Sequence, residues 1–148
     1  MILRILRRVV IALGAALLLG VTVFVLVRWQ SLPAELPSHY DAAGNIDATS
    51  GKSGLWMLLI LSWVLYGVMN LASLLPASAW NPPPKSPLAL HAMRLVLSVM
   101  ALFMTLCFCY LVLCTALCVP LGAWFLPVML TLTFLPVAAL GVISVKIT

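Results

Sequence analysis

The length of its apolar stretches constrains this chain more than any other feature of the sequence. Residues 9–27 and 55–75 contain no charged side chain, and from about 93 to 145 only Arg94 is charged. A helix that spans a bilayer needs about 20 consecutive apolar residues. Only 7% of the residues are charged, against about 25% in soluble domains, so we predict an integral membrane protein. Its 148 residues have room for about four spans and for no separate soluble catalytic domain.

The third apolar stretch is too long for one helix and must be divided. Residues 118–122 contain Pro120 and Gly122, which both favour a turn. We therefore predict an all-α membrane protein, a single domain over residues 1–148 with a bundle of four transmembrane helices at about 9–27, 55–75, 93–116 and 121–145. The first span is interpreted as a retained helix and not as a signal peptide. Its apolar run is longer than the about 7–15 residues typical of a signal peptide, and no small-residue cleavage site follows it.

The basic residues lie near the ends of the apolar stretches. There they indicate topology and contact with lipid headgroups, and not a nucleic-acid surface, although the net charge is +5. A cytoplasmic N-terminus satisfies the positive-inside rule, because it places inside Arg4, Arg7, Arg8, Lys85, Arg94 and Lys146, and outside only Arg28 and Lys52. Both termini are then expected to be cytoplasmic. Loop 28–54 is extracytoplasmic, and the proline-rich loop 76–92, with a stiff spacer at 81–85, is cytoplasmic.

The outer loop, residues 28–54, contains most of the scarce polar chemistry of the chain. It holds all three acidic residues, Glu35, Asp41 and Asp47, together with His39. The two prolines within 32–37 predict an extended segment. Residues 38–40 fit a short strand, and residues 41–45 have the composition of a tight turn. We therefore predict an ordered extracytoplasmic loop between the first two helices.

The motif in this loop resembles a known family. It reads Leu32-Pro33-x-x-Leu36-Pro37-x-His39-Tyr40-Asp41-x-x-Gly44-x-x-Asp47, followed by Gly51-Lys52. This pattern is similar to the small bacterial membrane domain of unknown function found at the N-terminus of SdpI-type immunity proteins, over about residues 20–75. The chain differs in having Ser50-Gly51-Lys52 where the family has Gly-Ser-Lys, and residues 93–148 lack the motifs of the second half of SdpI-type proteins. The resemblance implies a four-helix protein of the bacterial inner membrane, and toxin immunity is one role within that family.

Several roles are open to the motif residues of the loop. These residues are Pro37, His39, Tyr40, Asp41, Gly44, Asp47 and Lys52. In a structural role, Asp41 and Asp47 accept turn N–H groups, Lys52 pairs with one of them, and His39 holds the loop on the helix ends. In a second role the loop is a rigid platform that binds a ligand. Weaker alternatives are a zinc or manganese site of His39, Asp41 and Asp47, which lacks a typical ligand spacing, and acid–base catalysis.

Polar and small side chains recur at helical spacing inside the predicted spans. Ser62, Tyr66, Asn70 and Ser73 share one helix face, as do Arg94, Ser98, Thr105 and Cys109. They form either interhelical hydrogen bonds or a polar path through the bundle. Ala12, Ala16 and Gly20 form a ladder that allows close helix contact within the bundle or in a homodimer. The cysteines, Cys107, Cys109, Cys114 and Cys118, contain no Cys-x-x-Cys and are interpreted as small core residues.

These observations predict a binding or protective protein of the inner membrane that is not an enzyme and needs no cofactor. It resembles SdpI-type immunity proteins, and its outer loop is expected to engage a membrane-active peptide or a membrane partner. The alternative is a small transporter, or an accessory subunit of a membrane complex, that uses the stripe of Ser62, Tyr66, Asn70 and Ser73. Membrane lipids are expected contacts, nucleic acids are not, and a homo-oligomer is compatible with the small-residue ladder.

Overall fold

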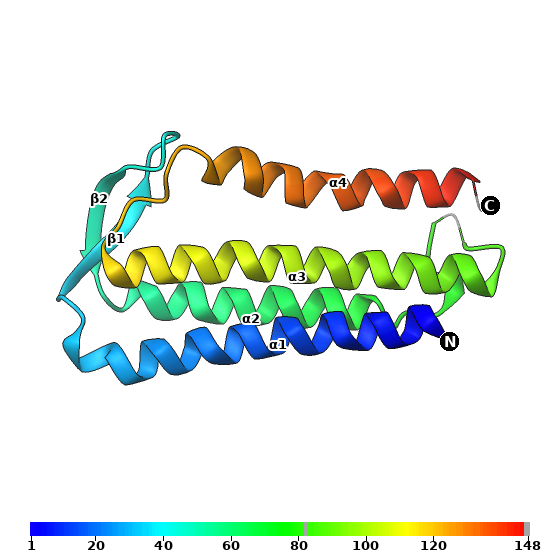
Figure 1. The fold of residues 1–148 in the computed structure, drawn as a ribbon, viewed down its shortest axis with the longest axis horizontal. Coiled ribbons are helices and arrows are strands. Elements are labelled where there is room, and N and C mark those ends of the chain that lie inside the picture. Colours follow the sequence, from blue (N-terminus) through cyan, green and yellow to red (C-terminus); the bar gives the residue numbers. More distant parts are fainter. Residues whose placement is uncertain (82, 147–148) are drawn as a thin grey trace.

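Four helices lie side by side, with a β-hairpin across one end of the bundle (Figure 1). The computed structural model describes residues 1–81 and 83–146. The helices are α1 (Ile2–Arg28), α2 (Gly54–Ala72), α3 (Pro87–Leu117) and α4 (Phe125–Lys146), with 3-10 turns at Trp29–Ser31 and Ala77–Ala79. The hairpin consists of β1 (Glu35–Tyr40) and β2 (Ile46–Gly51). The start of α1 and the end of α4 lie at the end of the bundle opposite the hairpin.

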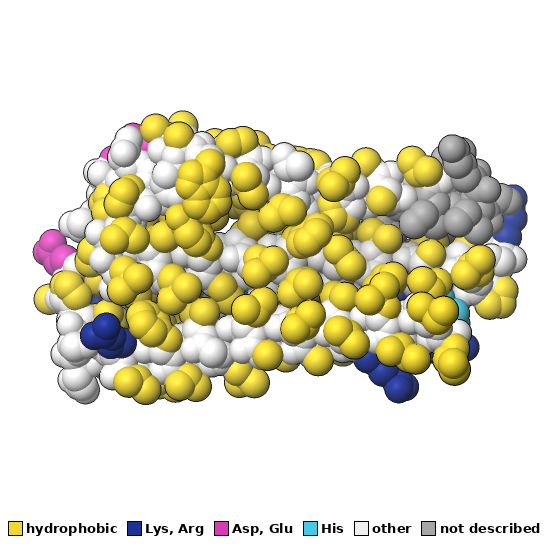
Figure 2. Space-filling model, viewed as in Figure 1, with side chains coloured by type: hydrophobic (Ala, Val, Ile, Leu, Met, Phe, Trp, Pro, Cys, Tyr) yellow, Lys and Arg dark blue, Asp and Glu magenta, His cyan; other side chains and the backbone are white. Residues whose placement is uncertain are grey.

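The surface of the bundle is that of a membrane protein. Three helices in the described chain are long and apolar enough to cross a membrane, with candidate spans at Ile2–Ser31, Gly54–Ala72 and Pro87–Leu117. The fourth helix contains a shorter apolar segment, Phe125–Ala139. Figure 2 shows apolar side chains along the flanks, acidic side chains at the hairpin end and most basic side chains toward the opposite end. Apolar flanks between polar ends are what a bilayer requires.

The central helix is α3, which α1, α2 and α4 all contact. In Figure 1 α4 lies on the other side of α3 from α1. Small buried residues of α3, such as Ala101, allow neighbouring helices to approach closely. The helix begins after Ser86, whose hydroxyl accepts the Ala89 N–H at 3.1 Å, with Pro87 in the first turn. It ends where Cys118 adopts a left-handed conformation with φ of 54°.

One face of α1 packs into the bundle, and its buried residues are Val10, Gly14, Leu18, Val21 and Val25. A Cβ on Gly14 would lie 2.7 Å from Cε2 of Tyr66, so only glycine leaves room for this ring. The ladder of Ala12, Ala16 and Gly20 is on the exposed face of α1. The predicted contact of this ladder within the bundle is therefore wrong, while its contact with a second copy stays a prediction.

The structure corrects the all-α fold and several boundaries. The outer loop forms two strands, whereas a single short strand was expected. The first helix begins at Ile2 and not near residue 9, because arginines near the membrane surface continue the helix. The predicted loop 76–92 ends sooner, because the Ser86-Pro87 start makes residues 87–92 helical. The last helix begins at Phe125 and not at 121, since the preceding residues contact the hairpin. The spacer predicted at 81–85 includes residue 82, which lies outside the described residues.

Candidate functional site

The hairpin is held on the helix ends by Leu36 of β1. This side chain is 2% exposed and belongs to the main apolar core. The same core contains Val25 of α1, Leu55 of α2 and Val112 of α3. Burial of a leucine contributes about 1.5–3 kcal/mol, so Leu36 is one anchor of the outer loop, and β1 contacts α2 and α3.

The two strands pair antiparallel, but their register is irregular on both sides of His39. Neither Ser38 nor Asp47 has a partner in this register. Irregularities of this kind redirect side chains and interrupt the regular alternation of strand faces. The result is that the imidazole of His39 and the carboxylate of Asp47 meet, although their backbones are not paired.

The hairpin turn is organised by Asp41. Its Oδ1 accepts the backbone N–H of Asn45 at 2.8 Å, and its Oδ2 accepts the Asn45 side-chain amide at 3.1 Å. Hydrogen bonds from Asn45, the backbone one first, lower the pKa of the Asp41 carboxyl below its ordinary value. The expected structural role of Asp41 is therefore confirmed, and its carboxylate is already engaged within the turn.

Gly44 joins the hairpin to the connection between α3 and α4. Its carbonyl accepts the N–H of Leu121 at 2.8 Å. Its φ of 81° is a left-handed conformation, and a Cβ here would lie 2.6 Å from the carbonyl oxygen of Gly122. Two backbones therefore meet at a distance that only glycine allows.

Tyr40 connects the end of β1 to α3. Its hydroxyl shares a hydrogen bond of 3.3 Å with Oγ1 of Thr115, a residue 75 positions later. Burial raises the pKa of the Tyr40 hydroxyl above its ordinary value. At neutral pH the group is thus a neutral hydrogen-bonding partner, and it closes one wall of the space beneath the hairpin.

His39 and Asp47 form an exposed pair on the hairpin. Nδ1 of His39 lies 2.6 Å from Oδ1 of Asp47, and the two side chains are 69% and 44% exposed. An exposed pair contributes little to stability, about 0–1 kcal/mol. His39 was expected to hold the loop on the helix ends, but its hydrogen bond is to Asp47 within the hairpin, so this expectation is wrong. Both side chains remain partly accessible to a ligand.

Lys52 does not pair with an acidic residue, which corrects the predicted ion pair. Its Nζ donates to the carbonyl oxygen of Trp29 at 3.2 Å and lies 4.9 Å from the centre of the Trp29 ring. The rings of Trp29 and Trp56 are 5.1 Å apart. No carboxylate lies within 4.0 Å of Lys52 among the described residues, and the lysine instead fastens the end of β2 to the end of the first helix.

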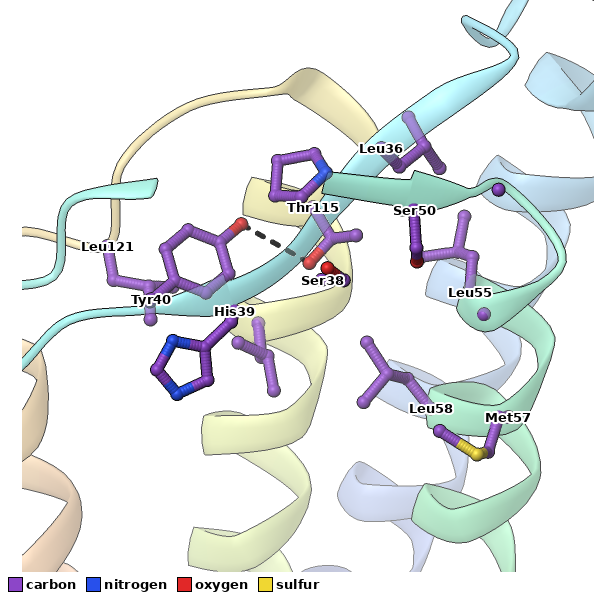
Figure 3. A pocket seen from close by; sticks show the side chains of 14 residues that line it. Leu36, Ser38, His39, Tyr40, Ser50, Leu55, Met57, Leu58, Thr115 and Leu121 are labelled. Carbon is purple, nitrogen blue, oxygen red and sulfur yellow. Dashed lines mark hydrogen bonds between the residues drawn. The ribbon is translucent and has the colours of Figure 1, made fainter. Parts of the chain in front are cut away.

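A pocket of about 310 Å³ lies beneath the hairpin, between the ends of α2 and α3 (Figure 3). This volume is at the lower end of the about 300–1,000 Å³ typical of ligand pockets. The lining contains apolar residues below and polar side chains from the hairpin and α3 at one side: Leu36, Pro37, Leu55, Met57, Leu58, Leu111 and Leu121, with Ser38, His39, Tyr40, Ser50 and Thr115. The pocket thus offers an apolar floor and a polar edge.

The three weak metal candidates are not brought together. His39 pairs with Asp47, but Asp41 is bound by Asn45 in the turn. Residues 1–81 and 83–146 contain no group of three or more His, Cys, Asp or Glu side chains placed to hold an ion. The alternative of acid–base catalysis requires a His–Asp pair, and Nδ1 of His39 lies 2.6 Å from Oδ1 of Asp47. The described contacts therefore do not gather His39, Asp41 and Asp47 around one point.

The polar stripe of α2 is largely engaged with backbone carbonyls. Tyr66 donates to Ile11 of α1 at 2.6 Å, Ser62 to Leu58 at 2.6 Å, and Asn70 to Tyr66 at 2.9 Å. Ser73 likewise donates to the Asn70 carbonyl at 2.6 Å. In the other predicted row, Ser98 and Thr105 are buried. The predicted interhelical bonding is therefore confirmed only for Tyr66, because the other three bonds lie within α2. Oγ of Ser98 and Oγ1 of Thr105 have no hydrogen-bond partner among the described residues.

Several residues of the pocket were not found from the sequence. Thr115, Leu121, Met57 and Leu58 line it, and none of them was predicted to lie beside the outer loop. Gly122 was recognised as a turn residue, but its contact with Gly44 was not predicted. Among these, only Gly122 carries a sequence signal, as part of the turn predicted at 118–122. The others are ordinary apolar or hydroxyl residues that the hairpin meets in three dimensions.

Comparison with known proteins identifies one region of the chain. Residues 16–62 match a domain of unknown function, DUF1648. This match runs from α1 through the hairpin into α2, and it confirms the small membrane domain predicted from the loop motif. No significant match was found among curated proteins or among solved structures.

Proposed function

We propose that this DUF1648-containing membrane protein is a binding protein of the bacterial inner membrane. In this proposal it captures a membrane-active peptide through the pocket beneath its outer hairpin. The observation that carries the proposal is the pocket of about 310 Å³ at the junction of the hairpin and the helix ends. Its action is stoichiometric, as in the SdpI-type immunity proteins that the loop motif resembles.

The shape of the pocket suits an apolar side chain that enters from the membrane surface. Leu55 and Leu58 of α2 and Leu111 of α3 contribute to its floor. Trp29 and Trp56, whose rings contact each other at the same end of the bundle, are typical of the membrane interface. A peptide that lies in this interface presents apolar side chains at the depth of the pocket and polar groups toward the hairpin.

The edge of the pocket suits the charge of such a peptide. Glu35, Asp41 and Asp47 are the acidic residues of the chain, and all lie in the hairpin. Peptides that bind membrane surfaces are commonly rich in Lys and Arg. The exposed carboxylate of Asp47 and the neighbouring His39 therefore form a polar contact for a basic group beside the apolar floor.

The hairpin is held in place before any ligand arrives. Leu36 is buried in the core, Tyr40 bonds to Thr115, and Gly44 contacts the α3–α4 connection. Order of this kind lowers the entropy lost on binding, because fewer groups must be immobilised. We infer that the pocket recognises its ligand without a large rearrangement, with the hairpin on the extracytoplasmic side and both termini in the cytoplasm.

The test is a substitution that fills the pocket. Leu58→Trp is prepared in lipid nanodiscs, and binding of a synthetic amphipathic Leu/Lys peptide with a fluorescent label is measured by anisotropy. We expect the dissociation constant to rise at least about tenfold, which corresponds to about 1.4 kcal/mol. The matched control is Leu61→Trp, which places the same side chain on the exposed face of α2 and leaves binding unchanged.

A second variant separates the outer site from the stripe inside the membrane. His39→Ala removes an exposed edge residue with little risk to folding, and we expect weaker peptide binding. Asn70→Ala should leave binding intact. Equal binding by wild type, Leu58→Trp and His39→Ala contradicts the proposal, and loss of binding only in Asn70→Ala favours the path through the bundle. Protection is read out in parallel as peptide-induced dye leakage from proteoliposomes.

A further inference from the structure

A second charged cluster lies at the end of the bundle opposite the hairpin. Arg4 and Arg7 of α1 are three residues apart, as are His91 and Arg94 of α3, so each pair shares one helix face. The Arg4 Nε–H donates to Nε2 of His91 at 3.1 Å and thereby links the two helices. Arg7 is close enough to Arg94 for the two positive charges to repel each other.

These positive charges have no acidic partner in the described part of the chain. Every Asp and Glu of the sequence lies in the hairpin segment 35–47, at the other end of the bundle. Among the described residues, 1–81 and 83–146, the one pair of acidic and basic side chains with N and O atoms within 4.0 Å is His39 with Asp47, which also lies in the hairpin. Gathered like charges at the edge of a membrane are costly unless an anion compensates for them.

Unpartnered hydrogen-bond donors occur at the same end. The Nε–H groups of Arg7 and Arg94 and the indole N–H of Trp80 are buried without an acceptor among the described residues. Arg94 is held from the other side, because its Nη2 donates to the carbonyl of Leu75 at 2.9 Å. Buried donors normally have an acceptor. All three atoms are donors, so what each of them lacks is a hydrogen-bond acceptor.

We propose that Arg4, Arg7 and Arg94 form a site for the phosphate group of an anionic phospholipid, between the ends of α1 and α3. The planar guanidinium groups bind phosphate oxygens in pairs. A phosphate at this place supplies acceptors for the unpartnered Nε–H groups of Arg7 and Arg94. The site is at the far end of the bundle from the hairpin pocket and does not depend on the function proposed for that pocket.

The surroundings favour a phosphate that belongs to a lipid over free phosphate. Ile5 of α1 is 52% exposed and Leu88 of α3 is 63% exposed, and each lies within one helical turn of a residue of the cluster. Acyl chains can therefore run along the apolar flanks of the two helices while the headgroup stays at the basic cluster. Basic pockets between helix ends are known to bind lipid headgroups in this manner.

The experiment is native mass spectrometry of the full chain with lipids of matched acyl chains. The protein is released from mixed micelles that contain equal amounts of phosphatidylglycerol and phosphatidylcholine. We expect wild type to retain phosphatidylglycerol preferentially, and Arg7→Gln to reduce this preference about fivefold, the change that corresponds to about 1 kcal/mol per basic residue. Arg94→Lys keeps the charge but not the planar guanidinium group. It should reduce the preference for phosphatidylglycerol less than Arg94→Gln does.

The matched control is Arg8→Gln, which removes the same charge from an exposed neighbour of Arg7. Preference within about twofold of wild type is expected for this variant, since a bidentate site depends on position as well as charge. Equal losses in Arg7→Gln and Arg8→Gln overturn the site, because they indicate diffuse surface charge. If millimolar inorganic phosphate displaces phosphatidylglycerol in the same micelles, the result contradicts a lipid as the occupant of the site. A circular dichroism melt confirms that each variant is folded.

Discussion

Replacement of Gly44 by alanine tests how the hairpin is attached to the helices. The native φ of 81° is left-handed, which costs a non-glycine residue about 1–2 kcal/mol. The added Cβ would also lie 2.6 Å from the Gly122 carbonyl oxygen, and relief of such overpacking costs about 1–3 kcal/mol. The two effects together predict a loss of about 2–5 kcal/mol in the free energy that holds the hairpin turn on the α3–α4 connection.

Hydrogen–deuterium exchange in nanodiscs measures this loss directly. The reporter is the amide of Leu121, which donates to the Gly44 carbonyl at 2.8 Å. Because each 1.4 kcal/mol is about a factor of ten, the smallest expected loss accelerates exchange about 30-fold where exchange follows the opening equilibrium. The amides within α1 should keep their wild-type protection, since the change is local.

The control for Gly44→Ala is Gly20→Ala, in which the new Cβ has no atom within 4 Å. It lies in the exposed face of α1, where alanine favours the helix. Exchange at Leu121 should not change in this variant. Wild-type protection of Leu121 in Gly44→Ala would refute the close contact between the two glycines and, with it, the anchoring of the turn.

Three other contacts give separate predictions. Hydrogen bonding lowers the pKa of Asp41 in the folded protein. Its contribution to the stability of the turn is therefore present above the ordinary carboxyl pKa of about 3.9 and is lost as the pH falls through the lower folded value. NMR shifts of Asn45 should follow this loss, and Asp41→Asn should remove the pH dependence. Tyr66→Phe loses the bond to the α1 backbone and should cost about 0.6–1.5 kcal/mol in detergent unfolding, with a larger loss contradicting a single bond. Lys52→Met should alter Trp29 fluorescence and lower stability by about 1 kcal/mol, whereas an unchanged spectrum contradicts the contact with the ring.

The helices were predictable because hydropathy is a local property. Uncharged stretches as long as residues 9–27 leave few alternatives to a spanning helix. The hairpin turn was predictable for a similar reason, since Asp41 and Gly44 have the required chemistry within four residues. The helix ends were less predictable. Hydropathy does not register the Ser86-Pro87 start, which extends the third helix beyond its apolar stretch.

The pocket was not predictable because it is made by contacts between distant segments. Tyr40 meets Thr115 across 75 positions, and neither residue has a local pattern that names the other. Lys52 was assigned to a carboxylate because charge alone was considered. In the structure a backbone carbonyl and an aromatic ring at Trp29 take that place. A partner predicted from opposite charge alone is wrong where a carbonyl at a helix end is a nearby neutral acceptor.

The charge distribution of the chain makes its two ends functionally separable. In the hairpin each carboxylate has a local partner: Glu35 accepts from Thr49 at 3.3 Å, Asp41 from Asn45, and Asp47 from His39. These acids therefore do not neutralise any basic side chain of the membrane helices. Since electrostatic interactions between exposed charges are screened beyond about 8–10 Å in physiological salt, changes at the hairpin should not alter lipid preference at the opposite end. Conversely, loss of the arginine cluster should leave peptide binding intact, because the arginines belong to the proposed lipid site and not to the pocket beneath the hairpin.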